Sequence, residues 1–250
     1  MAINIKSAII SNKGIVRAYN EDNFVFDRRI LTDINEEISI AKTAKCDKCI
    51  IAVFDGMGGE SSGEIASKIA ATTFQKIKNT TLEGVKNAIF SANMEICQYM
   101  KINKIKRMGT TVAAVYIDKT SISVVNVGDS KIYKYEKGTL EQVSYDHITT
   151  RHNNRRELTQ HLGIFPNEMQ IEPYIFTDKI KDRIRYLICS DGLTDMVSEE
   201  DIAVSMSNSI EEIPIILKDK AIENGGRDNI TIVVFEIKKE AKKIFEKMFN

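Results

Sequence analysis

The chain reads Ile50-Ile51-Ala52-Val53-Phe54-Asp55-Gly56-Met57-Gly58-Gly59 over residues 50–59, and this stretch decides the fold. Five consecutive apolar residues predict a buried β-strand. An aspartate and three glycines end it abruptly, and glycine lets the backbone come close to a ligand. Taken alone, the Asp55-Gly56 step is equally typical of an ordinary turn. Its meaning therefore depends on what the rest of the chain places beside it.

Carboxylates stand at the ends of three more strand-like runs: Asp191 after residues 184–189, Asp228 before 229–237, and Glu21-Asp22 before 23–27. In an antiparallel sheet the end of one strand lies beside the start of its neighbour, so these acids can meet at one edge. Oxygen ligands without histidine or thiolate favour Mg²⁺ or Mn²⁺ over zinc or copper. The pattern predicts a hydrolase with two metal ions.

The remaining segments predict a single α+β domain without internal repeats. Two capping boxes, Ser61-x-x-Glu64 and Thr80-x-x-Glu83, introduce amphipathic helices. Further strands are expected over 3–10, 111–117, 122–127, 131–135 and 171–176, further helices over 198–207 and 210–223, and a loop or extended hairpin over 28–48. Short hairpin connections indicate antiparallel sheets, which the helix pairs must cover.

Composition excludes several partners. The 250 residues include 35 basic and 35 acidic side chains, so net charge gives no argument for nucleic acid or an anionic membrane as a partner. No segment approaches the roughly 20 apolar residues that span a bilayer. The first ten residues lack the features of a signal peptide. We therefore expect a cytoplasmic protein.

The four cysteines do not suggest a disulfide framework in a chain of this length. Cys46-x-x-Cys49 has the spacing of half a zinc site or of a redox motif, but no second pair accompanies it. A reduced pair in a surface loop is the expectation, and a metal or redox role is the alternative.

Other catalytic chemistries find little support. All three histidines, His147, His152 and His161, fall in one polar stretch, and no Gly-x-Ser-x-Gly motif is present. The glycines after Asp55 fit neither a dinucleotide fingerprint nor a P-loop.

Six motifs follow one another along the chain: Arg17-Ala18-Tyr19-Asn20-Glu21-Asp22, Val53-Phe54-Asp55-Gly56-Met57-Gly58-Gly59, Met108-Gly109-Thr110-Thr111, Val127-Gly128-Asp129-Ser130, Cys189-Ser190-Asp191-Gly192-Leu193-Thr194-Asp195 and Gly225-Gly226-Arg227-Asp228-Asn229-Ile230-Thr231. With these motifs, over about residues 5–237, the chain resembles the metal-dependent protein serine/threonine phosphatases of the PPM family (type 2C) in their bacterial form. The resemblance implies two stacked antiparallel β-sheets flanked by antiparallel helix pairs, a four-layer αββα sandwich.

The resemblance also implies a ligand set. Asp55 would bridge two Mn²⁺ or Mg²⁺ ions, Asp191 and Asp228 would complete one ion, and Glu21 with the Gly56 carbonyl would hold the other. Water bridging two such ions is acidified and attacks phosphorus directly.

Three further residues are assigned by the resemblance. Asp22 would orient the attacking water, Arg17 would bind the substrate phosphate, and Asp129 would hold a weaker third ion. Arg17 offers a planar fork that matches two phosphate oxygens. The alternatives are a surface ion pair between Arg17 and Glu21, and an ordinary hairpin turn at Asp129.

Supporting roles are expected nearby. Thr110 and Thr111 would support the site through packing and hydrogen bonds, and Asp195 is most simply a local capping residue. Met57 stands where eukaryotic relatives carry a histidine proposed as general acid.

The flap at about 146–158 is shorter than relatives usually carry. Its arginines, Arg151, Arg155 and Arg156, would attract phosphorylated substrates, unless they belong to a solvated basic loop. Residues 1–240 are expected to form one catalytic domain, and residues 241–250 a short C-terminal helical tail.

The predicted function is a monomeric phosphatase acting on phosphoserine and phosphothreonine proteins, including a cognate serine/threonine kinase and its substrates. The alternative is a non-catalytic relative that uses the same fold as a binding or regulatory module. Such a relative would be expected to have lost a metal ligand, and Glu21, Asp55, Asp191 and Asp228 are all present.

Overall fold

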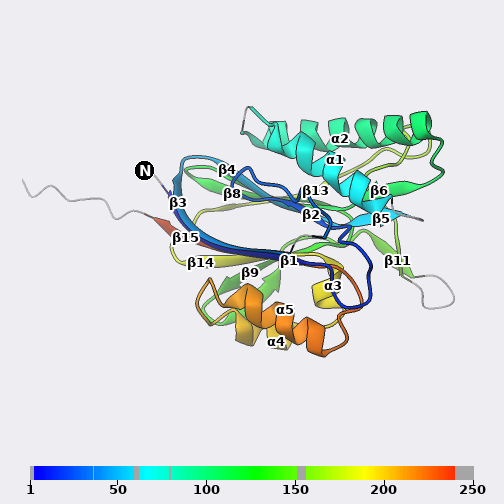
Figure 1. Cartoon of the computed structure of the whole chain (residues 1–250). Coiled ribbons are helices and arrows are strands. Elements are labelled where there is room, and N and C mark those ends of the chain that lie inside the picture. The colour runs from blue at the N-terminus through cyan, green and yellow to red at the C-terminus, as the bar shows by residue number, and fades with distance from the viewer. Residues whose placement is uncertain (1–2, 36, 59–61, 79, 151–155, 240–250) are drawn as a thin grey trace, which may run out of the picture.

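The structure, a computed structural model, describes residues 3–35, 37–58, 62–78, 80–150 and 156–239. Within these ranges, two antiparallel β-sheets stack face to face, and helices cover their outer faces (Figure 1). The predicted α+β class with four layers is therefore confirmed.

The first sheet has six strands in the order β10-β9-β14-β15-β1-β3. They are β1 (Ile3–Asn12), β3 (Ile38–Cys46), β9 (Lys131–Glu136), β10 (Thr139–Gln142), β14 (Ile184–Cys189) and β15 (Ile230–Lys239). Strands β14 and β15 pair antiparallel, with Cys189 opposite Ile232. The residues that follow β14 and those that precede β15 consequently lie at the same edge.

The second sheet has five strands in the order β13-β8-β7-β4-β2. They are β2 (Asn23–Val25), β4 (Cys49–Phe54), β7 (Val112–Ile117), β8 (Ser121–Val127) and β13 (Tyr174–Lys179). Asn23 lies opposite Phe54, so the start of β2 adjoins the end of β4. In both sheets, therefore, the residues after one strand lie beside the residues before its antiparallel neighbour.

Two small sheets and five helices complete the described chain. Strand β5 (Gly56–Gly58) pairs with β6 (Met108–Thr110), and β11 (Ile148–Thr150) pairs with β12 (Arg156–Leu158). The helices are α1 (Gly63–Gln75), α2 (Leu82–Asn103), α3 (Asp191–Thr194), α4 (Glu199–Ser205) and α5 (Ile213–Glu223). Helices α1 and α2 cover the second sheet, whereas α3, α4 and α5 lie on the first (Figure 1).

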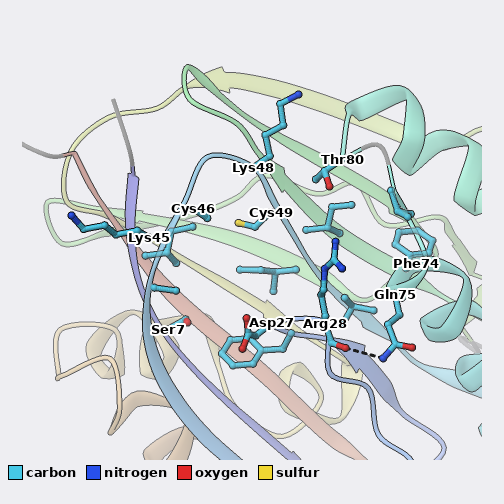
Figure 2. A pocket seen from close by; sticks show the side chains of 17 residues that line it. Ser7, Asp27, Arg28, Lys45, Cys46, Lys48, Cys49, Phe74, Gln75 and Thr80 are labelled. Carbon is cyan, nitrogen blue, oxygen red and sulfur yellow. Dashed lines mark hydrogen bonds between the residues drawn. The ribbon is translucent and has the colours of Figure 1, made fainter.

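The chain crosses from the first sheet to the second between β3 and β4, through the two residues Asp47 and Lys48. A cavity of about 240 Å³ lies beneath this crossing and is bordered by β1, the residues after β2 and the end of α1 (Figure 2). Figure 1 places the crossing at the opposite end of the sandwich from β5, β6 and β11.

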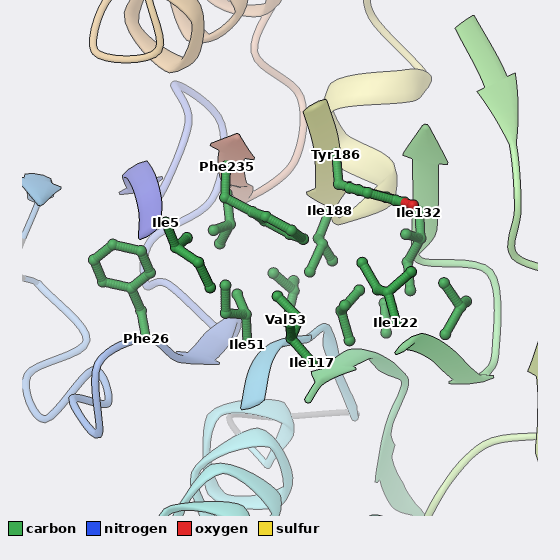
Figure 3. Packing of buried hydrophobic residues seen from close by; sticks show 14 of the residues in the cluster. Ile5, Phe26, Ile51, Val53, Ile117, Ile122, Ile132, Tyr186, Ile188 and Phe235 are labelled. Atoms are coloured by element: carbon green, nitrogen blue, oxygen red, sulfur yellow. The ribbon is translucent and has the colours of Figure 1, made fainter. Parts of the chain in front are cut away.

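The two sheets are held together by an apolar core of buried side chains (Figure 3). Phe235 of β15 is fully buried, and its ring stacks on that of Tyr186 with centroids 5.3 Å apart. Val53 of β4 faces them from the second sheet. Two further apolar clusters join each helix layer to its sheet. This packing fixes where the strand ends lie.

The structure corrects several predicted boundaries. The segment expected as a loop or hairpin over 28–48 contains β3, an edge strand whose solvent-facing lysines and threonine hide its periodicity. The second helix begins after Thr81, not Thr80, because Thr81 Oγ1 accepts the Gly84 N–H at 3.0 Å. Helix α5 begins only at Ile213, with proline in its first turn.

Some predictions cannot be compared with the structure. The tail helix over 241–250, Ser61 of the first capping box, and flap residues Arg151 and Arg155 lie outside the described residues. Among the helices that are described, none combines the length and apolarity required to cross a membrane.

We expect Phe235→Ala to lower the free energy of unfolding by about 3–5 kcal/mol, because it leaves a cavity between the sheets. Val204→Ala, at a side chain 67% exposed, is the control and should change stability by less than about 0.5 kcal/mol. Urea unfolding followed by circular dichroism measures both. Equal effects would mean that the stacked ring does not contribute to joining the sheets.

Candidate metal centre

Acidic side chains from both sheets line one cavity of about 640 Å³. They are Glu21, Asp55, Asp129, Asp146, Asp191, Asp195 and Asp228, joined by Glu157 of the short strand β12. Arg17 and Gly56 line the same cavity. Of the predicted site residues, Asp22 alone is not on its wall, and it lies buried behind it. The predicted convergence of distant strand ends is thus what the fold produces.

Asp55 follows β4 and is held by the strand that starts beside it. Its backbone N–H donates to Thr111 Oγ1 at 3.0 Å, and its carbonyl accepts from the Thr111 N–H and the Thr110 hydroxyl, both at 2.9 Å. These bonds satisfy the backbone of Asp55 without using its carboxylate. The supporting role predicted for the two threonines agrees with this geometry.

Asp22 joins the two sheets at the back of the site. Its side chain is only 2% exposed and accepts a hydrogen bond from Ser190 Oγ at 2.7 Å, just before Asp191. Thr231 of β15 supplies a second side-chain hydrogen bond. Burial nevertheless raises the pKa of Asp22 to about 7.

Glu21 is held at the start of helix α1. The Gly63 N–H at that helix terminus donates to Glu21 Oε1 at 3.2 Å, and the positive end of the helix dipole favours a carboxylate there. The Glu21 backbone N–H donates to Asn229 Oδ1 at 2.8 Å. Asn229 Nδ2 in turn donates to the carbonyls of Lys13 and Tyr19, both at 2.9 Å. One asparagine therefore fixes the loop that carries Arg17 and Glu21 against the start of β15.

The carboxylates of the two sheets repel one another across the cavity. Burial and then the charge of Asp191 raise the pKa of Asp55 well above its usual range. Burial, followed by Asp129 and Asp228, raises the pKa of Asp191 to about 7. Burial also raises the pKa of Asp129. The positive charges near these carboxylates do not balance their negative charge. Bound cations would offset the remaining repulsion.

Arg17 contributes a positive charge to this rim. Its Nη2 donates to Asp228 Oδ2 at 2.6 Å, and this hydrogen bond is the main cause of the raised pKa of Arg17. The ion pair considered from the sequence was with Glu21, but the structure pairs Arg17 with Asp228, 211 positions away. The arginine thereby lies beside a predicted metal ligand on the cavity wall, and its side chain is 48% exposed to solvent.

Two basic residues that line the cavity were not predicted from the sequence. Lys131, after the Asp129 turn, forms an ion pair with Asp146 at 3.3 Å, and Arg107 reaches the cavity from the loop after α2. Each of the two residues is adjacent to a motif identified in the sequence, Lys131 directly after Ser130 and Arg107 directly before Met108, and this adjacency was the available signal. Asp195 is the C-cap residue of α3, in agreement with the capping role predicted for it, and its backbone N–H donates to the Asp191 carbonyl at 2.8 Å. Its side chain forms an ion pair with Arg156 of the flap at 3.8 Å.

Three glycines around the site lie so close to neighbouring chain segments that no side chain would fit. A Cβ added to Gly192 would lie 2.0 Å from the Asn229 carbonyl oxygen, and one added to Gly56 would lie 2.3 Å from that of Gly63. A Cβ on Gly63 would meet Glu21 Oε1 at 2.6 Å. Glycine is thus required by close approach at all three positions.

The donors present fit hard divalent cations. All are carboxylate or carbonyl oxygens, and their mutual repulsion would be relieved by a cation. In the part of the chain that the structure describes, no three acidic, histidine or cysteine side chains are already grouped as ligands of one ion. Ions of the Mg²⁺ type usually retain several waters, so a wide ring of carboxylates suits them better than a closed cage.

Comparisons with known proteins agree with this site. The protein phosphatase 2C family matches residues 37–219. The serine/threonine phosphatase Stp of Listeria welshimeri is 29% identical over 255 residues, which cover 90% of this chain and 93% of the relative. PstP of Mycobacterium tuberculosis is 27% identical over 93% of this chain, which spans only 45% of that longer protein.

Solved structures share the fold. The crystal structure of M. tuberculosis PstP superposes with a TM-score of 0.77 at 26% identity, over 94% of this chain and 100% of that one. A structure of the PstP catalytic domain in complex with two manganese ions gives a TM-score of 0.76 at 26% identity, covering 95% and 100%. The family match, the ordered motifs and the shared fold lead to one conclusion: the chain belongs to the protein phosphatase 2C family, in its bacterial PPM form.

Proposed function

We propose that this protein serine/threonine phosphatase hydrolyses phosphoserine and phosphothreonine in proteins by direct attack of water, using two Mn²⁺ or Mg²⁺ ions. The observation that carries the proposal is the single cavity lined by carboxylates of both sheets together with Arg17. A relative with the same fold was solved with two manganese ions, which supports the same ion number here.

The ligand roles follow from position. Asp55 is central, since its carboxylate interacts with those of both Asp191 and Asp228, and we assign it to both ions. Asp191 and Asp228 are assigned to one ion, and Glu21 with the Gly56 carbonyl to the other. Two such ions, held by these residues, would supply the acidification of a water molecule near neutral pH.

The chain's own residues then position the reaction. Asp22 is held in one orientation by Ser190 and Thr231, from which we propose that it orients the attacking water. Arg17 can exchange its contact with Asp228 for two oxygens of the substrate phosphate, because its planar fork suits both partners. Asp129, with a pKa raised by burial, is proposed to hold a weaker third ion.

Substrates and partners follow from the reaction. The named relatives are serine/threonine phosphatases, so we propose that phosphoproteins, including a serine/threonine kinase and its substrates, are the substrates here. We propose a cytoplasmic monomer. Met57, which lines the cavity, provides no proton donor for the leaving alkoxide.

The flap supplies a positive charge at the mouth of the cavity. Arg156 lines the cavity and faces Asp195 at 3.8 Å, with a side chain 71% exposed. An exposed cation at this place can attract a phosphorylated segment before it binds. We propose this steering role for Arg156.

Release of phosphate from a phosphothreonine peptide should require Mn²⁺ or Mg²⁺ and stop in EDTA. Saturating Mn²⁺ should also raise Tm by roughly 5–10 °C, because it binds the folded site alone and relieves carboxylate repulsion. A malachite green assay and differential scanning fluorimetry measure these effects. Full activity in EDTA would exclude the mechanism, whereas a Tm response without activity would favour a non-catalytic module.

We expect Asp191→Asn to lower kcat roughly 10²-fold or more, since a charge that stabilises the reacting centre is lost. Without metal, the same variant should be more stable by on the order of 1 kcal/mol, because it removes a buried charge that its neighbours repel. Asp219→Asn, at an exposed ion pair with Lys218, is the matched control for both measurements. Near-native turnover of Asp191→Asn would remove Asp191 from the ligand set.

Arg156→Gln should lower kcat/KM for a phosphopeptide about three- to tenfold at low salt, because the variant loses the charge that attracts the substrate. At about 0.5 M salt the decrease should be much smaller, because salt screens this attraction in the wild type as well. Arg183→Gln, a change at an arginine whose side chain is 81% exposed and pairs with Asp182, is the control. If the two variants behave alike at low salt, Arg156 has no steering role.

A further inference from the structure

A pair of thiols borders the cavity beneath the β3–β4 crossing, far from the metal centre. Cys46 is the last residue of β3 in the first sheet, and Cys49 is the first residue of β4 in the second. Both line the cavity of about 240 Å³, and Figure 2 shows them side by side at its upper wall. The sequence spacing is that of redox-active and metal-binding pairs.

The two cysteines stand at either end of the two-residue turn between β3 and β4. Both are partly buried and pack against the core between the sheets. Cys46 pairs with Ile3 of β1, and Cys49 with Ile117 of β7. The sheets thus fix both ends of a two-residue turn and hold the two cysteines on the wall of one cavity.

The two thiols are chemically unequal. The neighbouring Cys49 thiol lowers the pKa of Cys46, whereas Cys46 together with burial raises the pKa of Cys49 well above its usual value. The thiolate is the reactive form of cysteine, so Cys46 is the better nucleophile and Cys49 its natural resolving partner.

The remaining two cysteines differ from this pair in their burial and in lacking a neighbouring thiol among the described residues. Cys97 and Cys189 are buried at 3% and 0% exposure, and burial raises the pKa of each thiol. Neither has a second thiol beside it among the described residues. They serve as internal controls for the reactivity of the pair.

We propose that Cys46 and Cys49 form a reversible redox site that hydroperoxides oxidise to an intrachain disulfide. The Cys46 thiolate attacks one peroxide oxygen, the O–O bond breaks, and Cys46 becomes a sulfenic acid while the other oxygen leaves as water or alcohol. The Cys49 sulfur then attacks Cys46, and the S–O bond breaks with release of water. Two thiols are oxidised to one disulfide and the peroxide is reduced; a dithiol reductant reverses the change.

The cavity provides a route for these reagents. It is wide enough for hydrogen peroxide, and Arg28 extends into it between Cys49 and Phe74 in Figure 2. The site is independent of the proposed phosphatase mechanism, since the crossing lies at the opposite end of the sandwich from β5, β6 and β11 (Figure 1).

Mass spectrometry of the full chain tests the proposal. Trypsin cleaves after Lys45, Lys48 and Lys68, so a disulfide would join peptide 46–48 to peptide 49–68. After treatment with hydrogen peroxide, we expect this linked pair, the loss of two hydrogen atoms from the intact mass, and full reversal by dithiothreitol. Cys97 and Cys189 should react at least about tenfold more slowly with an alkylating reagent.

Two variants separate the roles of the thiols. Cys49→Ser should leave Cys46 as a sulfenic acid that dimedone traps, whereas Cys46→Ser should leave Cys49 unmodified at the same dose. Unchanged mass of the oxidised wild type, a disulfide to Cys97 or Cys189, or dimers on a non-reducing gel would each overturn the proposal. Because the readout is mass, the result is distinguishable from any failure of phosphatase activity.

Discussion

Buried negative charge is the constraint on which this molecule depends. Carboxylates from the ends of β4 and β14 and the starts of β2 and β15 are brought to one cavity, where burial and mutual repulsion raise the pKa of Asp55 and Asp191. Burial also raises the pKa of Asp22, which lies behind the cavity wall. Among the described side chains at the rim, the ion pair of Arg17 with Asp228 offsets part of this charge. The apolar core between the sheets must therefore supply the stability that holds these groups together.

Much of the site could be predicted because its residues lie at strand ends. An apolar run followed by aspartate is visible locally, and antiparallel pairing brings such ends together, as it does for Asn23 opposite Phe54 and Cys189 opposite Ile232. The layers could also be predicted, since two amphipathic helices and several hairpins have strong periodic signals. The family resemblance added the individual metal roles.

The features of the fold and the site that were not predicted depend on contacts that no local sequence pattern encodes. Edge strand β3 carries solvent-facing lysines, so its sequence resembles a loop. The pairing of Arg17 with Asp228 and the bonds of Asn229 to the loop before β2 join residues about 210 positions apart. Arg107 lies just outside a motif, directly before Met108, and reaches the cavity through the path of its loop.

The glycine contacts at the metal centre determine where the enzyme can be altered. Gly56, Gly63 and Gly192 stand where neighbouring backbone or carboxylate atoms leave no room for a side chain, so these positions tolerate no diversification. Arg107 and Arg156, by contrast, are exposed at the mouth of the same cavity. A directed-evolution library for new phosphopeptide preferences should therefore randomise the loop after α2 and the flap strands, and keep the glycine-bearing turns invariant.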